Sequence, residues 1–319
     1  MASVPKPAHM ASLLLLLVTL VTVPLYHHLS SPSSSSYKTH LSNKRVLLCG
    51  IGYEVGEQLA YQLAEQGAKL VIFYRADGRQ KTLLNLQRTF ELTDDVIQII
   101  QPLMMARTDT KAQEIKDTAL KMGSPQVDIF PLDFGNVSSA QVVVDAAIHL
   151  LGGLDYVVLN HADIPRGFFM KSLKLQDVDF LLRTFTVNVY SYMEIALKAL
   201  PHLEKTSGHM FVTSSVLGEV PQSGLSVFSS TKHALNGFFY TLQEELRTRG
   251  SGVSLTVGSL GVMKSLELKA VMDVGESMMG GISECAKGIM DSMITKPRTF
   301  TYPILQPNFA RFMWSFFSS

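Results

Sequence analysis

Short apolar runs alternate with longer stretches of helical periodicity along most of this chain, and this alternation constrains the fold more than any other feature. Strands that are apolar on both faces and separated by helices pack as a parallel sheet covered on two sides. Because crossovers between parallel strands are right-handed, the sequence predicts a doubly wound α/β sheet. The predicted strands are residues 45–49, 69–74, 127–131, 155–159, 210–213 and 253–257, and the predicted helices are 54–66, 138–151, 178–200 and 227–249.

The size and charge of the chain narrow the range of functions. Of its 319 residues, 17% are charged, and the formal net charge is +1 without a long run of one sign. Such a balance offers no basic surface for nucleic acid. The two cysteines, Cys49 and Cys285, have neither a metal-ligand spacing nor a disulfide framework, so no metal is expected. Residues 44–300 have the length of one large domain.

The N-terminal segment differs from the rest of the chain. Residues 11–26 form an almost uninterrupted apolar run, somewhat shorter than the roughly 20 residues of a full membrane span. The run lacks a small-residue cleavage pattern, which favours an uncleaved signal anchor over residues 1–30 against a removed signal peptide. Residues 31–43 are typical of a serine-rich linker. The apolar tail at 301–319 either docks to a membrane or a partner or packs on its own domain.

A glycine-rich turn follows the first predicted strand and opens the first predicted helix. Gly50, Gly52 and Gly56 would let the backbone approach a pyrophosphate at the helix N-terminus, although an ordinary tight turn has the same composition. Its place in the first β/α unit favours dinucleotide binding in a single Rossmann-type domain. The second strand is followed by Arg75, and an arginine there can pair with a 2′-phosphate. NADP is therefore the expected cofactor, unless Arg75 is a solvated residue at a strand end.

A series of short motifs follows the predicted strands in a fixed order. Taken together, the motifs resemble the short-chain dehydrogenase/reductase family over about residues 44–266. Segments 152–161, 234–239 and 260–261 are similar to 11β-hydroxysteroid dehydrogenase type 1 and its 1-like relatives. The motif residues are the glycine turn, Asp133, Asn160, His161, Asn188, Ser215 and Lys232.

The resemblance implies hydride transfer between a nicotinamide and a secondary alcohol or ketone. In such a site a tyrosine exchanges a proton with the substrate oxygen, and a lysine one helical turn later lowers the tyrosine pKa. Lys232, Ser215 and Asn188 match the family's lysine, its substrate-binding serine and its water-holding asparagine. Lys232 also matches a contact to the nicotinamide ribose. Further cofactor contacts are implied at Asp133, Asn160, His161 and Ser265, and His161 is equally well interpreted as a hydrogen-bonded loop histidine.

Two positions depart from the family pattern. Phe228, four residues before Lys232, stands where the pattern requires tyrosine, and none of the ten tyrosines has a lysine four residues later. The missing general acid removes about 10²–10⁴-fold of rate enhancement. Glu54 stands where the turn usually has glycine, so its carboxylate would crowd and repel a pyrophosphate. The connection between the second and third strands is longer than the resemblance implies, and it predicts extra helices at 94–105 and 109–122.

The sequence leaves two main functions open. The first is an NADP(H)-dependent oxidoreductase that interconverts hydroxyl and keto groups on a steroid-like or other lipophilic substrate. If such an enzyme turns over efficiently, the phenylalanine at position 228 is a variant or a sequence error in an otherwise active protein. The second is a catalytically impaired family member that binds cofactor or a lipophilic ligand as a sensor, scaffold or dimer partner. The resemblance also implies a homodimer at the endoplasmic reticulum membrane with a lumenal domain. A secreted protein is the alternative.

Overall fold

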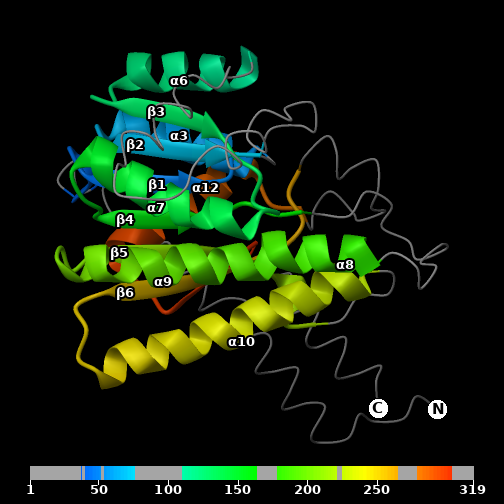
Figure 1. Ribbon diagram of the computed structural model, residues 1–319. Coiled ribbons are helices and arrows are strands. Elements are labelled where there is room, and N and C mark those ends of the chain that lie inside the picture. The colour runs from blue at the N-terminus through cyan, green and yellow to red at the C-terminus, as the bar shows by residue number, and fades with distance from the viewer. Residues whose placement is uncertain are drawn as a thin grey trace, which may run out of the picture.

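The computed structural model of this protein contains a parallel sheet with helices on both faces (Figure 1). The residues that it describes are 37, 40–51, 54–75, 110–163, 178–220, 225–264 and 279–303. Their strands are β1 (Arg45–Cys49), β2 (Lys69–Tyr74), β3 (Val127–Pro131), β4 (Tyr156–Leu159), β5 (His209–Ser215), β6 (Ser254–Leu260) and β7 (Thr299–Tyr302).

The strand order matches a doubly wound sheet. In the described part of the chain, seven strands hydrogen-bond in the order β3-β2-β1-β4-β5-β6-β7. Every pairing is parallel. The order reverses at the neighbours β1 and β4, and the carboxyl ends of these strands border the crevice in which such sheets bind ligands. The predicted fold class is therefore confirmed.

Two hydrophobic clusters cover the two faces of the sheet. Alternate side chains of β1 show the division, because Leu47 and Cys49 belong to one cluster and Val46 and Leu48 to the other. Since both faces are buried, the central strands are apolar at nearly every position. The first cluster is covered by α7 (Val137–Leu151), α9 (Ser191–Glu204) and α10 (Ser226–Thr248), and the second by α3 (Val55–Glu65), α6 (Thr110–Met122) and α12 (Ile282–Thr295).

The helix predicted at residues 178–200 is not a regular α-helix. It begins as α8 (Val178–Phe185), passes through a π-helical turn η1 (Thr186–Tyr190), and continues as α9. Figure 1 shows these segments running as one long rod beside α10. A π turn changes the direction of the side chains within it, and such turns are frequent at functional sites. Apolar periodicity alone does not distinguish this turn from a continuous α-helix.

The domain extends further at both ends than the sequence indicated. At the C-terminal end, α12 and β7 follow the six predicted strands, and β7 continues past the predicted boundary at residue 300. At the other end, Tyr37 and Leu41 pack in the second cluster, inside the stretch predicted to be a linker. The Tyr37 hydroxyl donates to the carboxylate of Asp291 on α12. Residues before the predicted start of the domain therefore share one core with α12 and β7 near its C-terminal end.

Within the described ranges, no helix combines the length and the apolar character needed to cross a bilayer. The predicted signal anchor at 1–30 and most of the apolar tail at 301–319 lie outside the described residues. The predicted helix at 94–105 also lies outside them. The helix predicted at 109–122 is observed as α6.

Candidate active site

Two glycines allow the turn between β1 and α3 to approach the end of β4 closely. Gly50 has a φ of +96°, and a Cβ there would lie 2.4 Å from the backbone nitrogen of His161. A Cβ on Gly56 would lie 2.2 Å from the carbonyl oxygen of Gly50. The side chain of Asn160 donates a 3.0 Å hydrogen bond to that oxygen and accepts one of 2.9 Å from Thr213. These contacts hold the turn at the crevice where the strand order reverses.

Glu54 precedes the first residue of α3, and its backbone is strained. Its φ is 59° and its ψ is −35°, a region that residues with a side chain rarely adopt. Its side chain does not cap the helix, so an anionic ligand such as a pyrophosphate can accept from the first N–H groups of α3. The start of α3 therefore suits a pyrophosphate, while Glu54, the residue just before these N–H groups, carries a carboxylate.

Replacing Glu54 by glycine is expected to raise the free energy of unfolding by about 1 kcal/mol, because glycine adopts positive φ without steric cost. The Glu54→Gln variant keeps the strained backbone and removes only the charge, so its stability should equal that of the parent. Both variants should bind NADPH more tightly than the parent does. Urea unfolding followed by circular dichroism measures the first effect, and fluorescence titration measures the second. An unchanged unfolding midpoint in the glycine variant would exclude backbone strain at this residue.

Lys232 lies on α10 with its side chain inside the protein. Its exposed fraction is 1%, and its amine donates a 3.1 Å hydrogen bond to the carbonyl oxygen of Thr213 on β5. The ring centroid of Phe228, one helical turn earlier, lies 5.6 Å from the same amine. Burial lowers the pKa of Lys232 from 10.5 to about 7. Near neutral pH the amine is therefore present in both its charged and its neutral form, beside a ring that has no hydroxyl.

Neighbouring hydroxyl groups do not take the place of the missing tyrosine oxygen. Ser229 and Thr231, which follow Phe228 on α10, each donate to a backbone carbonyl oxygen. The ring of Tyr192 lies 5.5 Å from the Lys232 amine, but its hydroxyl donates to another backbone carbonyl oxygen. Across the described segments, the Lys232 amine has no hydroxyl as a hydrogen-bond partner.

Ser215 is the last residue of β5 and caps a short 3₁₀ turn, η2 (Val216–Gly218). Its Oγ accepts a 3.2 Å hydrogen bond from a backbone N–H of that turn, which leaves the O–H able to donate to a substrate oxygen. Ser229 and Asn236 hold the turn against α10 through hydrogen bonds of 2.6 and 3.0 Å to its carbonyl oxygens. The packing of β5 on α10 therefore positions both Ser215 and Lys232.

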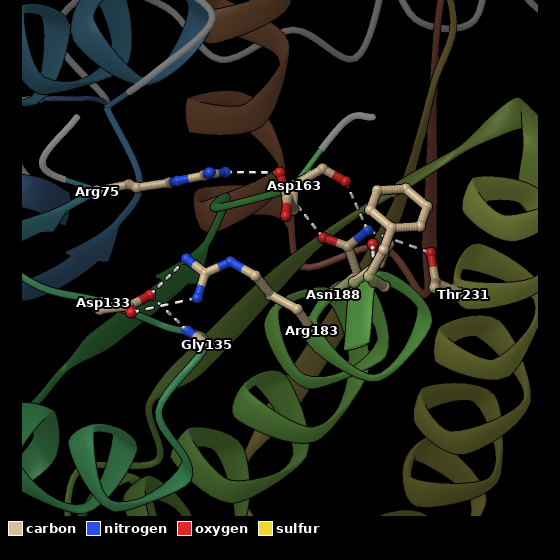
Figure 2. Close-up of polar contacts among 9 residues, drawn as sticks. Arg75, Asp133, Gly135, Asp163, Arg183, Asn188 and Thr231 are labelled. Carbon is tan, nitrogen blue, oxygen red and sulfur yellow. Dashed lines mark hydrogen bonds and ion pairs between the residues drawn. The ribbon is translucent and has the colours of Figure 1, made fainter. Parts of the chain in front are cut away.

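Asn188 lies in the π turn η1 and is completely buried. Its Oδ1 accepts a 2.7 Å hydrogen bond from the backbone nitrogen of Asp163, and its Nδ2 donates one of 2.9 Å to the carbonyl oxygen of Asp163 (Figure 2). The same Nδ2 lies 3.3 Å from the hydroxyl oxygen of Thr231 on α10. Asn188 therefore fixes the loop after β4 to the helix that carries Lys232. The water-holding role that the resemblance implies stays a prediction.

Two ion pairs join charged side chains at the carboxyl edge of the sheet (Figure 2). The guanidinium of Arg75, after β2, lies 2.6 Å from the carboxylate of Asp163. Asp133, after β3, pairs with Arg183 on α8 at 2.9 Å and accepts a 2.9 Å hydrogen bond from the backbone nitrogen of Gly135. Burial acts to raise the pKa of Asp133, but the bonds from Arg183 and Gly135 outweigh it and hold the pKa below its ordinary value. Sequence reasoning missed both Asp163 and Arg183.

His161 is buried at the start of the loop that follows β4. Its ring stacks on that of Phe134 with 3.8 Å between centroids, and the ring of Tyr192 lies 4.2 Å away. Its Nε2 lies 2.7 Å from the hydroxyl oxygen of Ser191, which donates its own hydrogen to a backbone carbonyl, so Nε2 carries the ring proton. Burial, together with the nearby charge of Lys232, lowers the pKa of His161. The neutral, packed ring favours the structural interpretation of this histidine over a cofactor contact by its side chain.

The predicted site residues form two connected groups. One group lies where β5 meets α10 and can polarise a carbonyl oxygen while supplying a basic amine. The other surrounds the crevice between β1 and β4 and can hold a dinucleotide. The first group consists of Ser215, Phe228 and Lys232, and the second of Gly50, Gly56, Arg75, Asp133 and Asn160. Asn188 joins the two groups through its hydrogen bonds. Gly52 and Ser265 lie outside the described residues.

Comparison with known proteins agrees with this geometry. A family model described as short chain dehydrogenase matches residues 98–273. The hydroxysteroid 11-beta-dehydrogenase 1-like protein of Danio rerio is 36% identical over 234 residues, which are 73% of this chain and 68% of the relative. The 1-like protein A of Xenopus laevis is 30% identical over 92% of this chain and 89% of its own length.

Solved structures show the same fold at lower identity. A short chain dehydrogenase from Burkholderia cenocepacia in complex with NADP has a TM-score of 0.60 and 21% identity, covering 82% of this chain and 96% of that structure. An NADH-dependent reductase complexed with NAD has a TM-score of 0.61 and 16% identity over 83% of this chain and 96% of its own. The neighbours therefore include complexes with either dinucleotide.

Proposed function

Because this chain belongs to the short-chain dehydrogenase/reductase family and is related to the hydroxysteroid 11-beta-dehydrogenase 1-like proteins, we propose that it is an NADP(H)-binding oxidoreductase that slowly interconverts hydroxyl and keto groups on a lipophilic, steroid-like substrate. The observation that carries the proposal is the site formed by β5 and α10. Ser215 and Lys232 are held there by the same packing, and the Phe228 ring faces the lysine amine. The names of the relatives, which refer to hydroxysteroids, support a lipophilic substrate.

The dinucleotide and the residues of the site have different roles in the proposed reaction. A bound nicotinamide dinucleotide supplies or accepts the hydride. The Ser215 hydroxyl donates a hydrogen bond to the substrate oxygen and stabilises negative charge that develops on it. The Lys232 amine adds positive charge nearby, and its pKa of about 7 keeps part of it protonated at neutral pH. With Phe228 in place no side-chain hydroxyl hands a proton to that oxygen, so the proton comes from solvent and the reaction is slow.

The preference for NADP(H) rests on Arg75. It follows β2, next to the turn that carries Gly50, and this is the place where a positive charge can reach a 2′-phosphate. Its side chain is 42% exposed, so a ligand phosphate can approach it. Arginine binds phosphate through paired N–H donors, whereas the ribose hydroxyl of NAD(H) carries no charge for it to bind.

Binding measurements test this assignment. We expect the full chain to bind NADPH about 3-fold to 10-fold more tightly than NADH, and Arg75→Gln to remove that difference. Arg249→Gln is the matched control, because Arg249 pairs with Glu204 at 3.8 Å on the surface and should leave both affinities unchanged. Isothermal titration with each dinucleotide gives the dissociation constants. Failure to bind either dinucleotide would overturn the proposed function, and an Arg75→Gln variant that binds NADPH as tightly as the parent does would overturn the role of Arg75.

A second candidate function is that of a family member that binds cofactor or a lipophilic ligand without turnover, as a sensor, scaffold or dimer partner. The absence of a hydroxyl partner for Lys232 among the described residues favours it. Incubating the NADPH-bound protein with a panel of ketosteroids separates the two functions. Saturable ligand binding with no alcohol product after many hours would select the second, and any product whose yield depends on Ser215 would select the first.

A further inference from the structure

The ion pair between Arg75 and Asp163 crosses the crevice in which a dinucleotide would lie. β1 pairs with β2 on one side and with β4 on the other, so its carboxyl end lies between the two loops that carry the ion pair. Arg75 follows β2, and Asp163 lies in the loop after β4, 88 residues away in sequence. Their 2.6 Å contact therefore lies over the end of β1, where the Gly50 turn begins.

The carboxylate is the fixed member of this pair. Asn188 holds both backbone groups of Asp163 with hydrogen bonds of 2.7 and 2.9 Å, and Asn188 is itself completely buried. The side chain of Asp163 is only 15% exposed, against 42% for Arg75. Figure 2 shows the extended Arg75 side chain reaching toward the Asp163 carboxylate. A ligand that binds the arginine therefore meets a carboxylate whose backbone is held in place.

Four charged side chains among the described residues form two ion pairs at this edge of the sheet. Arg75 and Asp163 form one pair, and Arg183 and Asp133 form the other at 2.9 Å. A 2′-phosphate that binds Arg75 brings about two negative charges next to these carboxylates and competes with Asp163 for the guanidinium. The uncharged 2′-hydroxyl of NAD(H) leaves the ion pair intact.

We propose that Asp163 is a specificity-determining residue that competes with the 2′-phosphate for Arg75 and so weakens the preference for NADP(H) over NAD(H). The inference rests on the proposed function, because it concerns the same dinucleotide site. Its physical basis is competition between two anions for one cation: the Asp163 carboxylate occupies the guanidinium that the 2′-phosphate would bind, whereas the uncharged 2′-hydroxyl of NAD(H) does not compete for it. Arg75 attracts the 2′-phosphate, and competition from Asp163 lowers the gain in NADP(H) affinity that this attraction provides.

The Asp163→Asn variant tests the proposal in the full chain. Its amide retains the size of the carboxylate, and its backbone can still bond to Asn188. We expect NADPH to bind about 5-fold to 10-fold more tightly than to the parent, and NADH to change by less than about 2-fold. Asp163→Ser, a smaller side chain, should act in the same direction. In an Arg75→Gln background the substitution should have no effect on NADPH, because the group for which the two anions compete is gone.

Asp145→Asn is the matched control. Asp145 pairs with Lys198 at 2.6 Å, the same separation as between Arg75 and Asp163, but on helices α7 and α9. This variant should leave both dissociation constants unchanged.

The outcomes distinguish this inference from the proposed function. If the parent binds NADPH and Asp163→Asn binds it no more tightly, the competition is overturned and the proposed function stands. If Asp163→Asn improves NADH binding as much as NADPH binding, the carboxylate repels the charge that both dinucleotides share, and the competition is again overturned. If neither the parent nor the variants bind either dinucleotide, both the proposed function and this inference are overturned.

Discussion

Replacing Phe228 by tyrosine is expected to raise the rate of ketone reduction by about 100-fold or more, because the new hydroxyl restores general acid catalysis. A factor of this size corresponds to about 3 kcal/mol of activation free energy. The Phe228 ring already lies 5.6 Å from the Lys232 amine, so an oxygen added to it is placed beside a positive charge that lowers its pKa. Single-turnover reduction of a ketosteroid by NADPH measures the rate of the chemical step.

Phe238→Tyr is the matched control for this substitution. Phe238 lies on the same helix, where its ring contacts that of Phe239 and is partly buried against the first cluster. A hydroxyl there lies outside the β5–α10 site and should not change the rate. If Phe228→Tyr is no faster than the parent, the parent has another proton donor and our interpretation of position 228 is wrong.

Replacing Lys232 by methionine is expected to raise the free energy of unfolding by about 3 kcal/mol near pH 6. At that pH the parent carries a charged amine in a fully buried position with a backbone carbonyl as its hydrogen-bond partner. A pKa lowered from 10.5 to about 7 implies a cost of about 1.4 kcal/mol for each pKa unit. Methionine occupies similar space without a charge, and the lost hydrogen bond to Thr213 offsets part of the gain.

This stabilisation should disappear as the pH rises. The unfolded chain holds the lysine proton up to about pH 10.5, whereas the folded protein releases it near pH 7, so unfolding takes up a proton between these values. The contribution of Lys232 to the free energy of unfolding therefore becomes less unfavourable from pH 7 to about 10.5, and the parent approaches the variant.

Urea unfolding at about pH 6 and about pH 10 measures the difference between parent and Lys232→Met at both ends of this range. Lys198→Met, which removes a partly exposed lysine paired with Asp145, should show no such dependence on pH. Equal differences at the two pH values would contradict a buried charge at position 232.

These two predictions concern the same site, one through its catalytic rate and the other through its effect on stability. Retaining a buried lysine destabilises the fold, and a charge that costs stability is typical of a functional position. With phenylalanine at 228 the same charge has no tyrosine to act on. The rate gain from Phe228→Tyr measures the catalysis that the remaining site residues can still support. The stability gain from Lys232→Met measures the free energy of unfolding that the buried lysine costs.

Much of the fold followed from local patterns. The six predicted strands are present because apolar runs bounded by glycine and polar residues have few alternatives once both faces of a sheet are buried. β7 was missed because the strand is four residues long and two of them are threonines. The π turn at Asn188 was missed because its extra residue leaves the apolar stripe of the helix almost unchanged.

The sequence by itself determined which chemical groups the site can contain. The spacing of Ser215, Phe228 and Lys232 survives in the structure because two of these residues lie one turn apart on a single helix, and the third ends the strand that packs on it. The missing tyrosine oxygen was therefore evident from residue type alone.

Only the tertiary structure decided which charges meet. Arg75 and Asp163 lie 88 residues apart in the chain, and nothing local to either predicts their contact. It arises because β2 and β4 flank β1, which brings the loops after them together, and because Asn188 fixes one of those loops. The same assembly buried His161 and removed Lys232 from water, since burial is a property of the packed layers and not of any single segment.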